Sequence, residues 1–329
     1  MDKRSLLTEY LACPDCLAGL TIGETYCTCP DCGNRYPVYD GEIVSALTGE
    51  MAQDVDFSRE KWTAYYKNER TRREAETVYR ESTLPIVLRQ LFDYTDERPK
   101  TPRVFLEIGC GQAFLGEEMA RRGWLFIGID YSLPVLRLLK VRLDSLSIDN
   151  YLLIHGDITR LPIRSGTIDF IYGGGVIEHF RDTQPVVDHL YRILCDQGVS
   201  FNSVPFVNIG NVLYRSRWGS IPNIPLVRQI AEFVNIRLLG GRHMRFGYEL
   251  QRTTGQLKNI HRRAGFRAED ITIDRFDYTV TLENVKNRKL RNVLTNLIKT
   301  NRHFWQMVKV VAIKRSVTQS GTASAVHKP

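Results

Sequence analysis

The 329-residue chain contains no run of 18 or more apolar residues, the length that a helix needs to cross a bilayer. Its first residues, 1–4, are not followed by the apolar stretch of a secretory signal. The seven cysteines fit a reducing compartment with a bound metal better than a disulfide framework, because four of them form two C-x-x-C pairs. These absences predict a cytoplasmic protein with no transmembrane segment.

The positive charge of the chain is concentrated in its second half. The net charge is +8, and residues 211–267 contain eleven Lys or Arg against only Glu232 and Glu249. Residues 286–315 are similarly basic. Such clustering indicates an anionic partner or surface, and a basic face that contacts only solvent is the alternative interpretation.

A buried strand is predicted to end at Glu107 and to be followed by a tight turn that contains Gly109 and Gly111. Residues 114–122 then have the pattern of a helix, so the unit is strand, glycine loop and helix. The third glycine of the dinucleotide fingerprint is missing, since Phe114 stands at that position, and this disfavours a pyrophosphate ligand. A carboxylate at the end of the strand suits a ligand with an ammonium group, and S-adenosylmethionine is such a ligand.

Two further strands end in carboxylates. Residues 124–130 form an apolar strand that ends in Asp130, about twenty residues after the glycines, where a carboxylate can accept hydrogen bonds from both ribose hydroxyls. Residues 151–155 form a third strand that leads to Asp157, which could accept from an adenine amino group.

A fourth strand, 167–172, opens into a loop that contains Gly174, Glu178 and His179. In open α/β sheets, ligands bind at the carboxyl ends of the strands, and all four loops lie at such ends. The sequence therefore predicts an α/β fold with a doubly wound Rossmann-like sheet and a ligand crevice at these loops.

These motifs resemble those of the class I S-adenosylmethionine-dependent methyltransferases, in the small-molecule, methyltransferase-11-like branch. The resemblance rests on the acid-Ile-Gly-Cys-Gly first motif and on the Glu-His pair after the fourth strand, and it covers residues 100–205. It implies that the first motif holds the methionine moiety, the acid after the second strand holds the ribose, and the third-strand Asp and its neighbour hold adenine. The cofactor-binding residues expected on this basis are Glu107, Gly109, Gly111, Asp130, Asp157 and Ile158, with Gly174 in the fourth loop. One departure is Ala113, where many members have glycine.

The candidate catalytic residues are His179 and its neighbour Glu178. A sulfonium methyl group is already activated, so the protein mainly aligns the acceptor and excludes water. An oxygen or nitrogen acceptor must also lose a proton, and a histidine is suited to take it. The alternative is that His179 only shapes the loop or contacts the cofactor.

Two C-x-x-C pairs near the amino terminus, separated by twelve residues, predict a metal site made by Cys13, Cys16, Cys29 and Cys32. Two such turns aim four thiolates at one tetrahedral ion, and the residues between them can form the hairpin of a zinc ribbon. Four thiolates leave no open position for substrate, so the zinc would be structural. A redox role is the rival interpretation, which the two matched pairs disfavour.

The residues after the second pair, Tyr36-Pro37 and Asp40-Gly41, resemble the tail of Trm112-like zinc ribbons, small proteins that bind and activate methyltransferases. The resemblance implies that residues 8–47 are such a ribbon fused to its enzyme.

Four further segments are expected from the pattern of the chain. Residues 56–98 form a helical cap whose aromatic residues either cover the cofactor pocket or belong to a core, and residues 100–315 form the methyltransferase domain. Residues 206–246 are an insert expected to act as a helical lid for substrate recognition. Residues 316–329 form a disordered tail.

Within the insert, residues 226–239 form an amphipathic run. Its apolar face is expected to pack on its own domain, with peripheral membrane contact or the binding of a lipid tail as the alternative. Residues 303–314 are expected to form the last, antiparallel edge strand of the sheet.

The sequence favours methyl transfer to an oxygen or nitrogen of a small molecule, glycan or lipid-linked intermediate. The alternative is an RNA base methyltransferase acting on rRNA or tRNA, in which the zinc ribbon recognises RNA and the basic segments follow phosphates. Against it, no Asn/Asp-Pro-Pro-aromatic motif of amine methylation follows the fourth strand. A non-catalytic scaffold is a third possibility, which the intact glycine corner disfavours.

Overall fold

The structure is a computed structural model that describes residues 3–47, 53–99, 101, 103–216, 219–244, 247–277 and 286–315. The disordered tail expected at 316–329 lies outside these residues. No helix in the described ranges combines the length and the apolar character that a membrane crossing requires.

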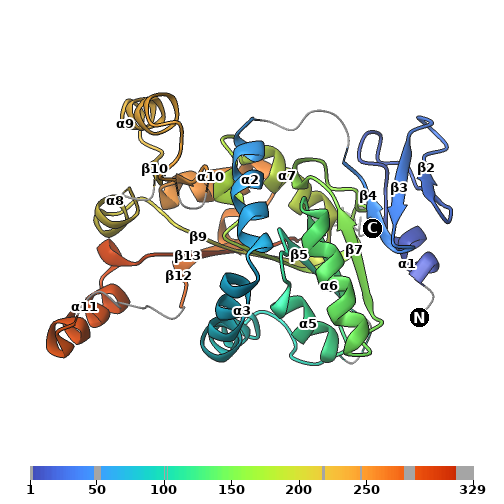
Figure 1. The fold of residues 1–329 in the computed structure, drawn as a ribbon, viewed down its shortest axis with the longest axis horizontal. Helices are drawn as coiled ribbons and strands as arrows, with labels where there is room; N and C mark the ends of the chain where they lie inside the picture. The colour runs from blue at the N-terminus through green and yellow to red at the C-terminus, as the bar shows by residue number, and fades with distance from the viewer. Residues whose placement is uncertain are drawn as a thin grey trace, which may run out of the picture.

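A single mixed sheet of eleven strands runs through the described part of the chain (Figure 1). Its order is β1-β2-β3-β4-β7-β6-β5-β8-β9-β13-β12. The middle strands β7, β6, β5, β8 and β9 are parallel, and the chain changes direction across the sheet between β5 and β8. They span Tyr151–His155 (β7), Leu125–Asp130 (β6), Val104–Ile108 (β5), Ile168–Gly174 (β8) and Leu194–Val204 (β9). This is the doubly wound α/β sheet that the sequence predicts.

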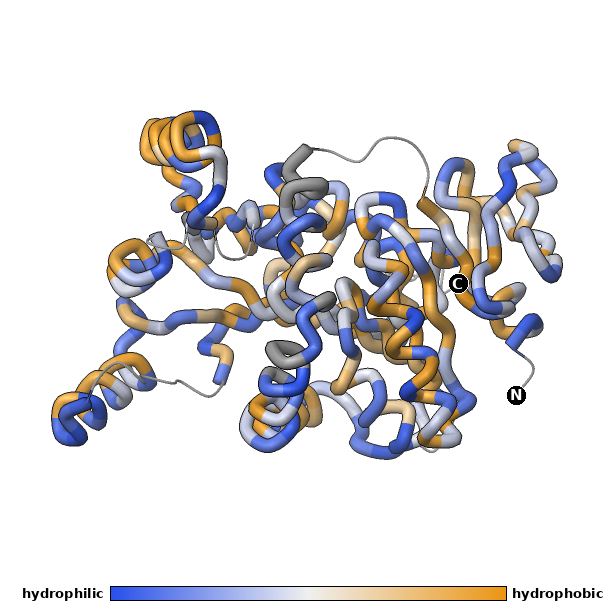
Figure 2. The backbone as a smooth tube through the Cα atoms, viewed as in Figure 1, coloured by the Kyte–Doolittle hydropathy of each residue, from blue (hydrophilic) through white to orange (hydrophobic). Residues whose placement is uncertain are grey.

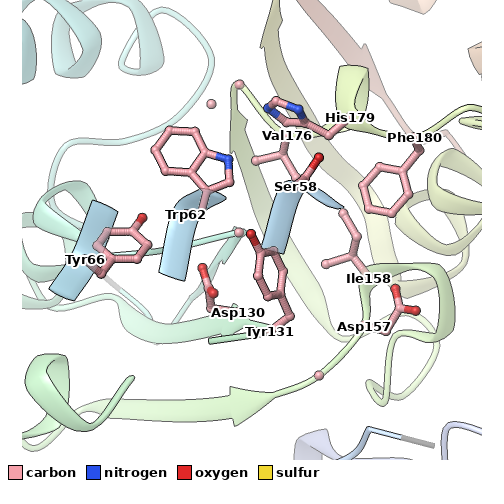
Figure 3. A pocket seen from close by; sticks show the side chains of 14 residues that line it. Ser58, Trp62, Tyr66, Asp130, Tyr131, Asp157, Ile158, Val176, His179 and Phe180 are labelled. Atoms are coloured by element: carbon pink, nitrogen blue, oxygen red, sulfur yellow. The ribbon is translucent and has the colours of Figure 1, made fainter. Parts of the chain in front are cut away.

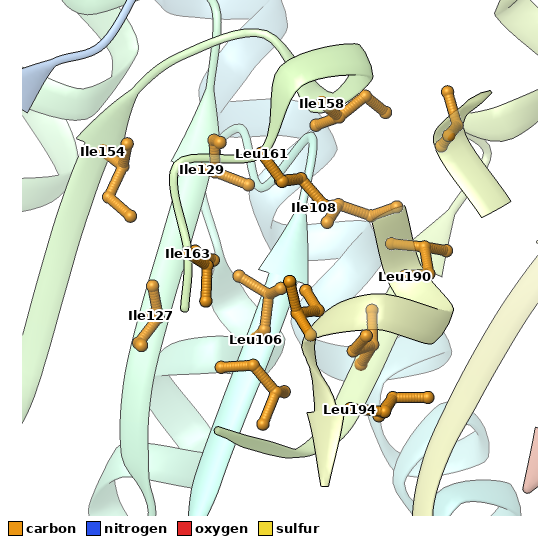
Figure 4. Close-up of a cluster of buried hydrophobic side chains, with 14 of the residues drawn as sticks. Leu106, Ile108, Ile127, Ile129, Ile154, Ile158, Leu161, Ile163, Leu190 and Leu194 are labelled. Atoms are coloured by element: carbon orange, nitrogen blue, oxygen red, sulfur yellow. The ribbon is translucent and has the colours of Figure 1, made fainter. Parts of the chain in front are cut away.

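Helices cover both faces of this sheet because its strands bury side chains on both sides. Leu106 faces one core, with α1 (Lys3–Tyr10), α7 (Gln184–Ile193) and α10 (Thr254–Ala264), as Figure 4 shows in part. Phe105, the preceding residue, faces a second core, with α4 (Leu84–Leu91), α5 (Phe114–Arg121) and α6 (Leu133–Ser145). Alternation along a strand buried on both faces explains why its residues read as one continuous apolar run.

The expectation that residues 303–314 form an edge strand is wrong. After the short helix η7 (Arg302–Phe304), β13 (Val308–Ile313) lies between β9 and β12 (Ile271–Arg275) and is antiparallel to both. β12 is the outer strand. The physical reason is burial: most of β13 is buried, whereas the side chains of β12 alternate between buried and accessible positions, as they do in a strand with one free face.

The amino-terminal module is part of the main sheet. Its strands are β1 (Thr21–Ile22), β2 (Tyr26–Thr28), β3 (Arg35–Tyr39) and β4 (Ile43–Ser45). β4 pairs in parallel with β7, and the Ser45 hydroxyl lies 2.9 Å from Nδ1 of His155. Leu11 belongs to the same core as Leu106. The module therefore covers an edge of the parallel sheet and shares its core.

Residues before β5 form a chain of helices. These are α2 (Gln53–Lys67), α3 (Glu69–Val78), the π-helical turn η1 (Tyr79–Thr83) and α4. Figure 1 shows α2 crossing over the carboxyl ends of the central strands. η1 is held to α5 by Arg80, whose guanidinium lies 2.8 Å from the buried Glu117 carboxylate of that helix. The cap is thereby anchored directly beside the glycine loop.

The insert after β9 contains α8 (Ile209–Arg215), β10 (Ile221–Pro222), α9 (Val227–Glu232) and the π-helix η5 (Phe233–Leu238). β10 pairs in parallel with β11 (Leu250–Gln251) over a small separate core that includes Tyr248. The chain then continues through α10, the turn η6 (Ala268–Asp270), β12 and α11 (Arg288–Thr300) to η7 and β13.

The expectation that the apolar face of 226–239 packs on its own domain is wrong. Leu226 is 67% exposed, Ile230 56% and Leu238 63%. The physical reason is that the polar face of α9 makes the contacts with the protein: Arg228 and Glu232 both bond to the Tyr248 hydroxyl. Figure 2 shows the apolar side of α9 turned outward.

Candidate active site

The loop after β5 is closed by two glycines in left-handed conformations. Gly109 has φ of +55° and Gly111 has φ of +49°, a region that favours glycine. A Cβ on Gly111 would lie 2.2 Å from the Tyr66 hydroxyl, so that position also has no room for a side chain. Ala113 adopts φ of +48°, which explains why a glycine is common at this position and why alanine costs some strain here.

Two buried carboxylates support this loop from the strands. Glu107, at the end of β5, accepts a hydrogen bond from the backbone N–H of Gly116 at 2.9 Å, in the first turn of α5. Asp130, at the end of β6, accepts from the N–H of Gly111 and from the N–H of Ser132, each at 2.8 Å. Asp130 therefore ties the glycine loop to the next strand.

A pocket opens where the loops of β5, β6, β7 and β8 meet (Figure 3). The predicted site residues that line it are Gly109, Asp130, Asp157, Ile158, Gly174 and His179. Glu107, Gly111 and Glu178 do not line it: Glu107 and Glu178 are buried, and Tyr66 covers Gly111. The four strand ends thus form one crevice, with three of the nine predicted residues behind its wall.

The helix α2 supplies the roof of the pocket. Ser58, Trp62 and Tyr66 all line it, and their spacing of four residues places them on one face of the helix. The rings of Trp62 and Tyr66 stack with centroids 6.2 Å apart, and Trp62 meets His179 edge-on at 6.5 Å (Figure 3). Of the aromatic residues in 56–98, Tyr79 belongs to the core instead, against Phe114.

The sequence pattern did not identify several other residues of the pocket wall. These are Tyr131, Gly156, Gly175, Val176 and Phe180, together with Ser58. Most of them are neighbours of predicted residues in the same loops, so the loops were the available signal. Ser58 carried only the weaker signal of its helical spacing to Trp62 and Tyr66.

The site contains three buried carboxyl groups with raised pKa values. Burial raises the pKa of Glu107 to about 8, that of Glu178 to about 7 and that of Asp130 to about 6. The nearby charge of Arg142 acts in the opposite direction on Glu107 without cancelling the effect of burial. A cationic ligand would favour ionisation of these groups, so the pocket is electrostatically suited to a sulfonium or an ammonium group.

We expect the affinity for S-adenosylmethionine to rise as the pH is raised from about 6 toward 8. The Glu107 carboxyl, with a pKa of about 8, is mostly neutral at the lower pH, and a cation in the pocket in front of it would favour its ionised form. The raised pKa stabilises the ligand-free protein at low pH, and this stabilisation is lost as the pH rises through 8, whereas cation binding favours the ionised form. The dissociation constant should fall by up to about tenfold for each pH unit.

Isothermal titration calorimetry in two buffers of different ionisation enthalpy measures the proton released on binding. The variant Glu107→Gln should bind weakly and with a smaller pH dependence, because only the Glu178 and Asp130 carboxyl groups still titrate in this range. The matched variant Glu81→Gln, at an exposed position of η1, should keep the wild-type pH dependence. An affinity that is flat between these pH values in the wild-type protein would contradict the assignment of Glu107.

His179 lies at the rim of the pocket, with Nδ1 at 2.5 Å from the backbone carbonyl of Tyr248. A carbonyl oxygen can only accept, so Nδ1 carries the proton and Nε2 has the free lone pair. The adjacent Glu178 is directed into the protein, and its Oε2 has no hydrogen-bond partner among the described residues. Of this pair, only His179 has its side chain at the pocket.

The four cysteines of the amino-terminal module form a compact cluster. The sulfur atoms of Cys13, Cys16, Cys29 and Cys32 all lie within 4.8 Å of one another. Cys13 and Cys32 are 3.6 Å apart, and Cys16 and Cys29 are 3.4 Å apart. Four thiolates around one zinc ion at about 2.3 Å stand roughly 3.8 Å from each other, so the cluster is compatible with a tetrahedral zinc site.

Tyr36, from the Tyr-Pro motif that follows the second cysteine pair, supports the cluster from outside. The Tyr36 hydroxyl lies 2.9 Å from the Cys13 sulfur and 2.9 Å from the Asp15 carboxylate. Tyr36 is the first residue of the Tyr-Pro pair. Cys27 is buried in the shared core and lies outside the cluster.

A comparison with protein families matches residues 106–201 to a methyltransferase domain. The chain contains a methyltransferase domain. The matched stretch includes every predicted cofactor-binding residue and the Glu178-His179 pair, whereas the roof helix α2, the cysteine module and the whole insert lie outside it. The match therefore covers the loops at the ends of the central strands and does not cover the roof of the pocket.

Solved structures of methyltransferases are similar to this chain at low sequence identity. The complex between the Haloferax volcanii Trm112 methyltransferase activator and the putative methyltransferase matches at a TM-score of 0.52 and 11% identity, over 77% of this chain and 97% of that chain. Phosphoethanolamine N-methyltransferase 2 of Haemonchus contortus, in complex with phosphomonomethylethanolamine and S-adenosylhomocysteine, matches at 0.47 and 16%, over 70% of this chain. The match spans 52% of that enzyme, about half its length. A sequence comparison of this chain with curated proteins found no match.

Proposed function

We propose that the protein transfers a methyl group from S-adenosylmethionine to an oxygen or nitrogen atom of a small-molecule, glycan or lipid-linked acceptor. The observation that carries the proposal is the pocket in which Asp130, Asp157 and His179 lie under an aromatic roof. Such a pocket offers carboxylates for the adenosyl part of a cationic cofactor and one histidine nitrogen for the acceptor. S-adenosylmethionine would supply the activated methyl group.

The residues of the pocket divide between the parts of the cofactor. Asp130 would hold the ribose hydroxyls, and the loop with Gly109 and Gly111 would hold the methionine part near Glu107. Asp157 uses Oδ1 to accept from the N–H of Thr159 at 2.8 Å, and its other oxygen could accept from the adenine amino group. Ile158 offers an apolar surface to the ring, and Gly174 leaves room along the pocket wall.

The acceptor side would be formed by His179 and the roof. Nε2 of His179 takes the proton that an alcohol or amine loses as its lone pair attacks the methyl carbon. Trp62 and Tyr66 exclude water from the line of attack and restrict the acceptor's orientation. The Tyr248 carbonyl keeps the imidazole in the tautomer that this role requires.

We expect His179→Asn to lower kcat by about 100-fold and to leave cofactor affinity within a factor of about three. The asparagine amide can still donate to the Tyr248 carbonyl in place of Nδ1, so the loop is preserved while the base is lost. Transfer of tritium from labelled S-adenosylmethionine into fractions of a cell extract measures the activity, and the best fraction then serves as substrate. The variant His189→Asn, on α7 away from the pocket, is the matched control. Equal rates for His179→Asn and the wild-type protein would remove His179 as the base.

We also propose that the cysteine cluster binds structural zinc and that residues 8–47 act as a fused Trm112-like ribbon. The short distances between the four sulfur atoms and the support of Cys13 by Tyr36 favour this proposal. In the Haloferax volcanii complex, Trm112 is a methyltransferase activator. In this chain the ribbon's β4 pairs with β7, so activation would occur within one polypeptide.

The proposed division of the chain follows from these roles. Residues 8–47 stabilise the sheet edge, 56–98 cap the pocket, 100–315 carry the catalytic sheet, and 206–246 form a lid on the acceptor side. The hydrogen bond between the Ser58 hydroxyl and the Tyr248 N–H, at 3.2 Å, joins the cap to the segment that follows the lid.

A further inference from the structure

Three helical segments at one end of the molecule expose apolar side chains. They are α8, the α9–η5 segment and α11, which lie at the opposite end from the β1–β4 module in Figure 1. Of the twenty exposed large apolar residues in the described part of the chain, fourteen lie in or beside these segments. Leu213 of α8 is 74% exposed and Val293 of α11 is 63% exposed. An exposed set of this size marks a binding surface.

The same end of the molecule is strongly basic. Residues 286–302, which contain α11, include six Lys or Arg and no Asp or Glu. Arg288, Lys289 and Arg291 are exposed. α11 is amphipathic and buries no residue, with apolar side chains at Leu290 and then at intervals of three or four residues. A helix of this kind favours a surface that is apolar and anionic at once.

A groove lies between α8 and η7, within this basic end. Phe206, Ile209, Val212 and Leu213 form its apolar wall, and Arg302 and His303 line its other side. The Asn208 amide bonds to the carbonyl of Trp305 at 2.6 Å and fixes α8 against the segment that leads to β13. The groove has the chemistry to accept an acyl chain with a phosphate near Arg302.

We propose that α8, α9–η5 and α11 form a docking surface for an anionic phospholipid bilayer, here called the lipid face. Nucleic acid would match the cations but would leave the exposed apolar side chains in water. A neutral apolar partner would match the side chains but not the cations of α11. A bilayer with anionic headgroups matches both, because its surface attracts Lys and Arg while apolar side chains enter the boundary with the acyl chains.

The lipid face is connected to the candidate active site through Tyr248. On one side, the Tyr248 hydroxyl donates to the Glu232 carboxylate of α9 at 2.7 Å. On the other, its backbone carbonyl accepts from Nδ1 of His179. Docking at α9 therefore places a membrane across one helix from Tyr248, whose carbonyl contacts the residue that would deprotonate the acceptor. We infer that the acceptor is a lipid or a lipid-linked molecule, an inference that rests on the proposed methyl transfer, whereas docking itself does not.

The test is co-sedimentation of the full-length protein with vesicles in the absence of cofactor. We expect binding to vesicles of phosphatidylglycerol and phosphatidylcholine in equal amounts, and at least about tenfold weaker binding to phosphatidylcholine alone. The variant Ile230→Glu/Phe233→Glu should bind at least about tenfold more weakly. Its matched control is Leu138→Glu/Val141→Glu, which changes two exposed apolar residues of α6 and should bind as the wild-type protein does.

A second pair of variants tests the cations. Arg288→Gln/Lys289→Gln should weaken binding to the anionic vesicles by roughly 25-fold, since each cation near a membrane contributes about fivefold. Arg35→Gln/Arg89→Gln removes two exposed cations elsewhere and should have little effect. All four variants should keep the wild-type affinity for S-adenosylmethionine, which shows that they fold.

Three outcomes would overturn the lipid face. The first is binding to both kinds of vesicle that none of the variants weakens. The second is displacement of the protein from vesicles by a molar equivalent of RNA. The third is a protein that binds no vesicles and instead forms a dimer in solution, which Ile230→Glu/Phe233→Glu dissociates. Each leaves the proposed methyl transfer intact, because cofactor binding is measured separately.

The lipid acceptor has a test of its own, which is labelling of cell fractions with tritiated methyl groups. Labelling of the membrane fraction that is lost in the lipid-face variants would support a lipid acceptor. Labelling confined to soluble fractions would overturn it.

Discussion

Replacing Cys13 with serine is expected to remove zinc from the protein and to lower its apparent melting temperature by at least about 10 °C. A structural zinc ion contributes roughly 10 kcal/mol or more to the folding of a small four-ligand module. Cys13 is fully buried, so a serine there leaves three thiolates and a poor ligand around the ion. Because 1 kcal/mol corresponds to about 2 °C in a chain of this size, loss of only part of this energy gives the expected shift.

The effect should extend beyond the ribbon because the ribbon belongs to the main sheet. β4 covers the edge of β7, and Leu11 packs in the core that also contains Leu106. Loss of the module exposes the unpaired edge of β7 and one side of that core. We therefore expect cofactor affinity to fall together with the melting temperature, even though no cysteine of the cluster lines the pocket.

Zinc content by inductively coupled plasma mass spectrometry and melting by differential scanning fluorimetry test this prediction. The matched control is Cys27→Ser, which changes an equally buried cysteine of the same module outside the four-sulfur cluster. It should retain about one zinc per chain and destabilise the protein much less. Full zinc content in Cys13→Ser would disprove the metal site. Two disulfides in the purified wild-type protein, detected by thiol titration, would favour the redox interpretation.

Replacing Asp130 with alanine is expected to weaken the binding of S-adenosylmethionine by roughly 1000-fold. A carboxylate that accepts two ribose hydroxyls makes two charge-assisted hydrogen bonds, each contributing about 1.5–3 kcal/mol. The substitution also removes the acceptor that holds the Gly111 N–H, so the glycine loop loses its support. Both effects act on the cofactor, and neither acts on the cysteine cluster.

Calorimetric titration with S-adenosylmethionine measures this loss, and the zinc content should stay unchanged. Asp169→Asn is the matched control because Asp169, in β8, also accepts a backbone N–H, that of Val104, and does not line the pocket. Asp130→Asn keeps an oxygen for the Gly111 N–H and should bind better than Asp130→Ala. Equal affinities for Asp130→Ala and the wild-type protein would contradict the placement of the ribose.

The features of the fold that the sequence predicts correctly come from local patterns of residues. Each central strand could be recognised from its apolar run, and each carboxylate or glycine followed its strand directly. In a parallel sheet the carboxyl ends of such strands meet at one edge. Asp130, Asp157 and His179 follow strands of this sheet and therefore lie around the same pocket. The position of β13 was also readable in principle, because Val308–Ile313 is a nearly continuous apolar run, whereas Ile271–Arg275 alternates.

The sequence does not predict which segment packs against a given helix face when that segment lies far away in the chain. The amphipathic pattern of 226–239 predicts a helix with an apolar face, but it carries no information on what covers that face. The same ambiguity applied to Trp62 and Tyr66, whose helical spacing fits a core as well as a roof. In both cases only the packing of segments far apart in the chain could decide.

Local patterns in the chain were enough to predict the parallel sheet, the cysteine cluster and the loops that make the pocket, because each depends on residues within a few positions of one another. Three features are visible only in the folded molecule: β4 extends the sheet beside β7, α2 closes the pocket, and the Tyr248 carbonyl contacts His179 from 69 residues away. The physical reason is that backbone pairing at a sheet edge and hydrogen bonds to a carbonyl use groups that nearly every residue has, so no side-chain pattern marks them in advance.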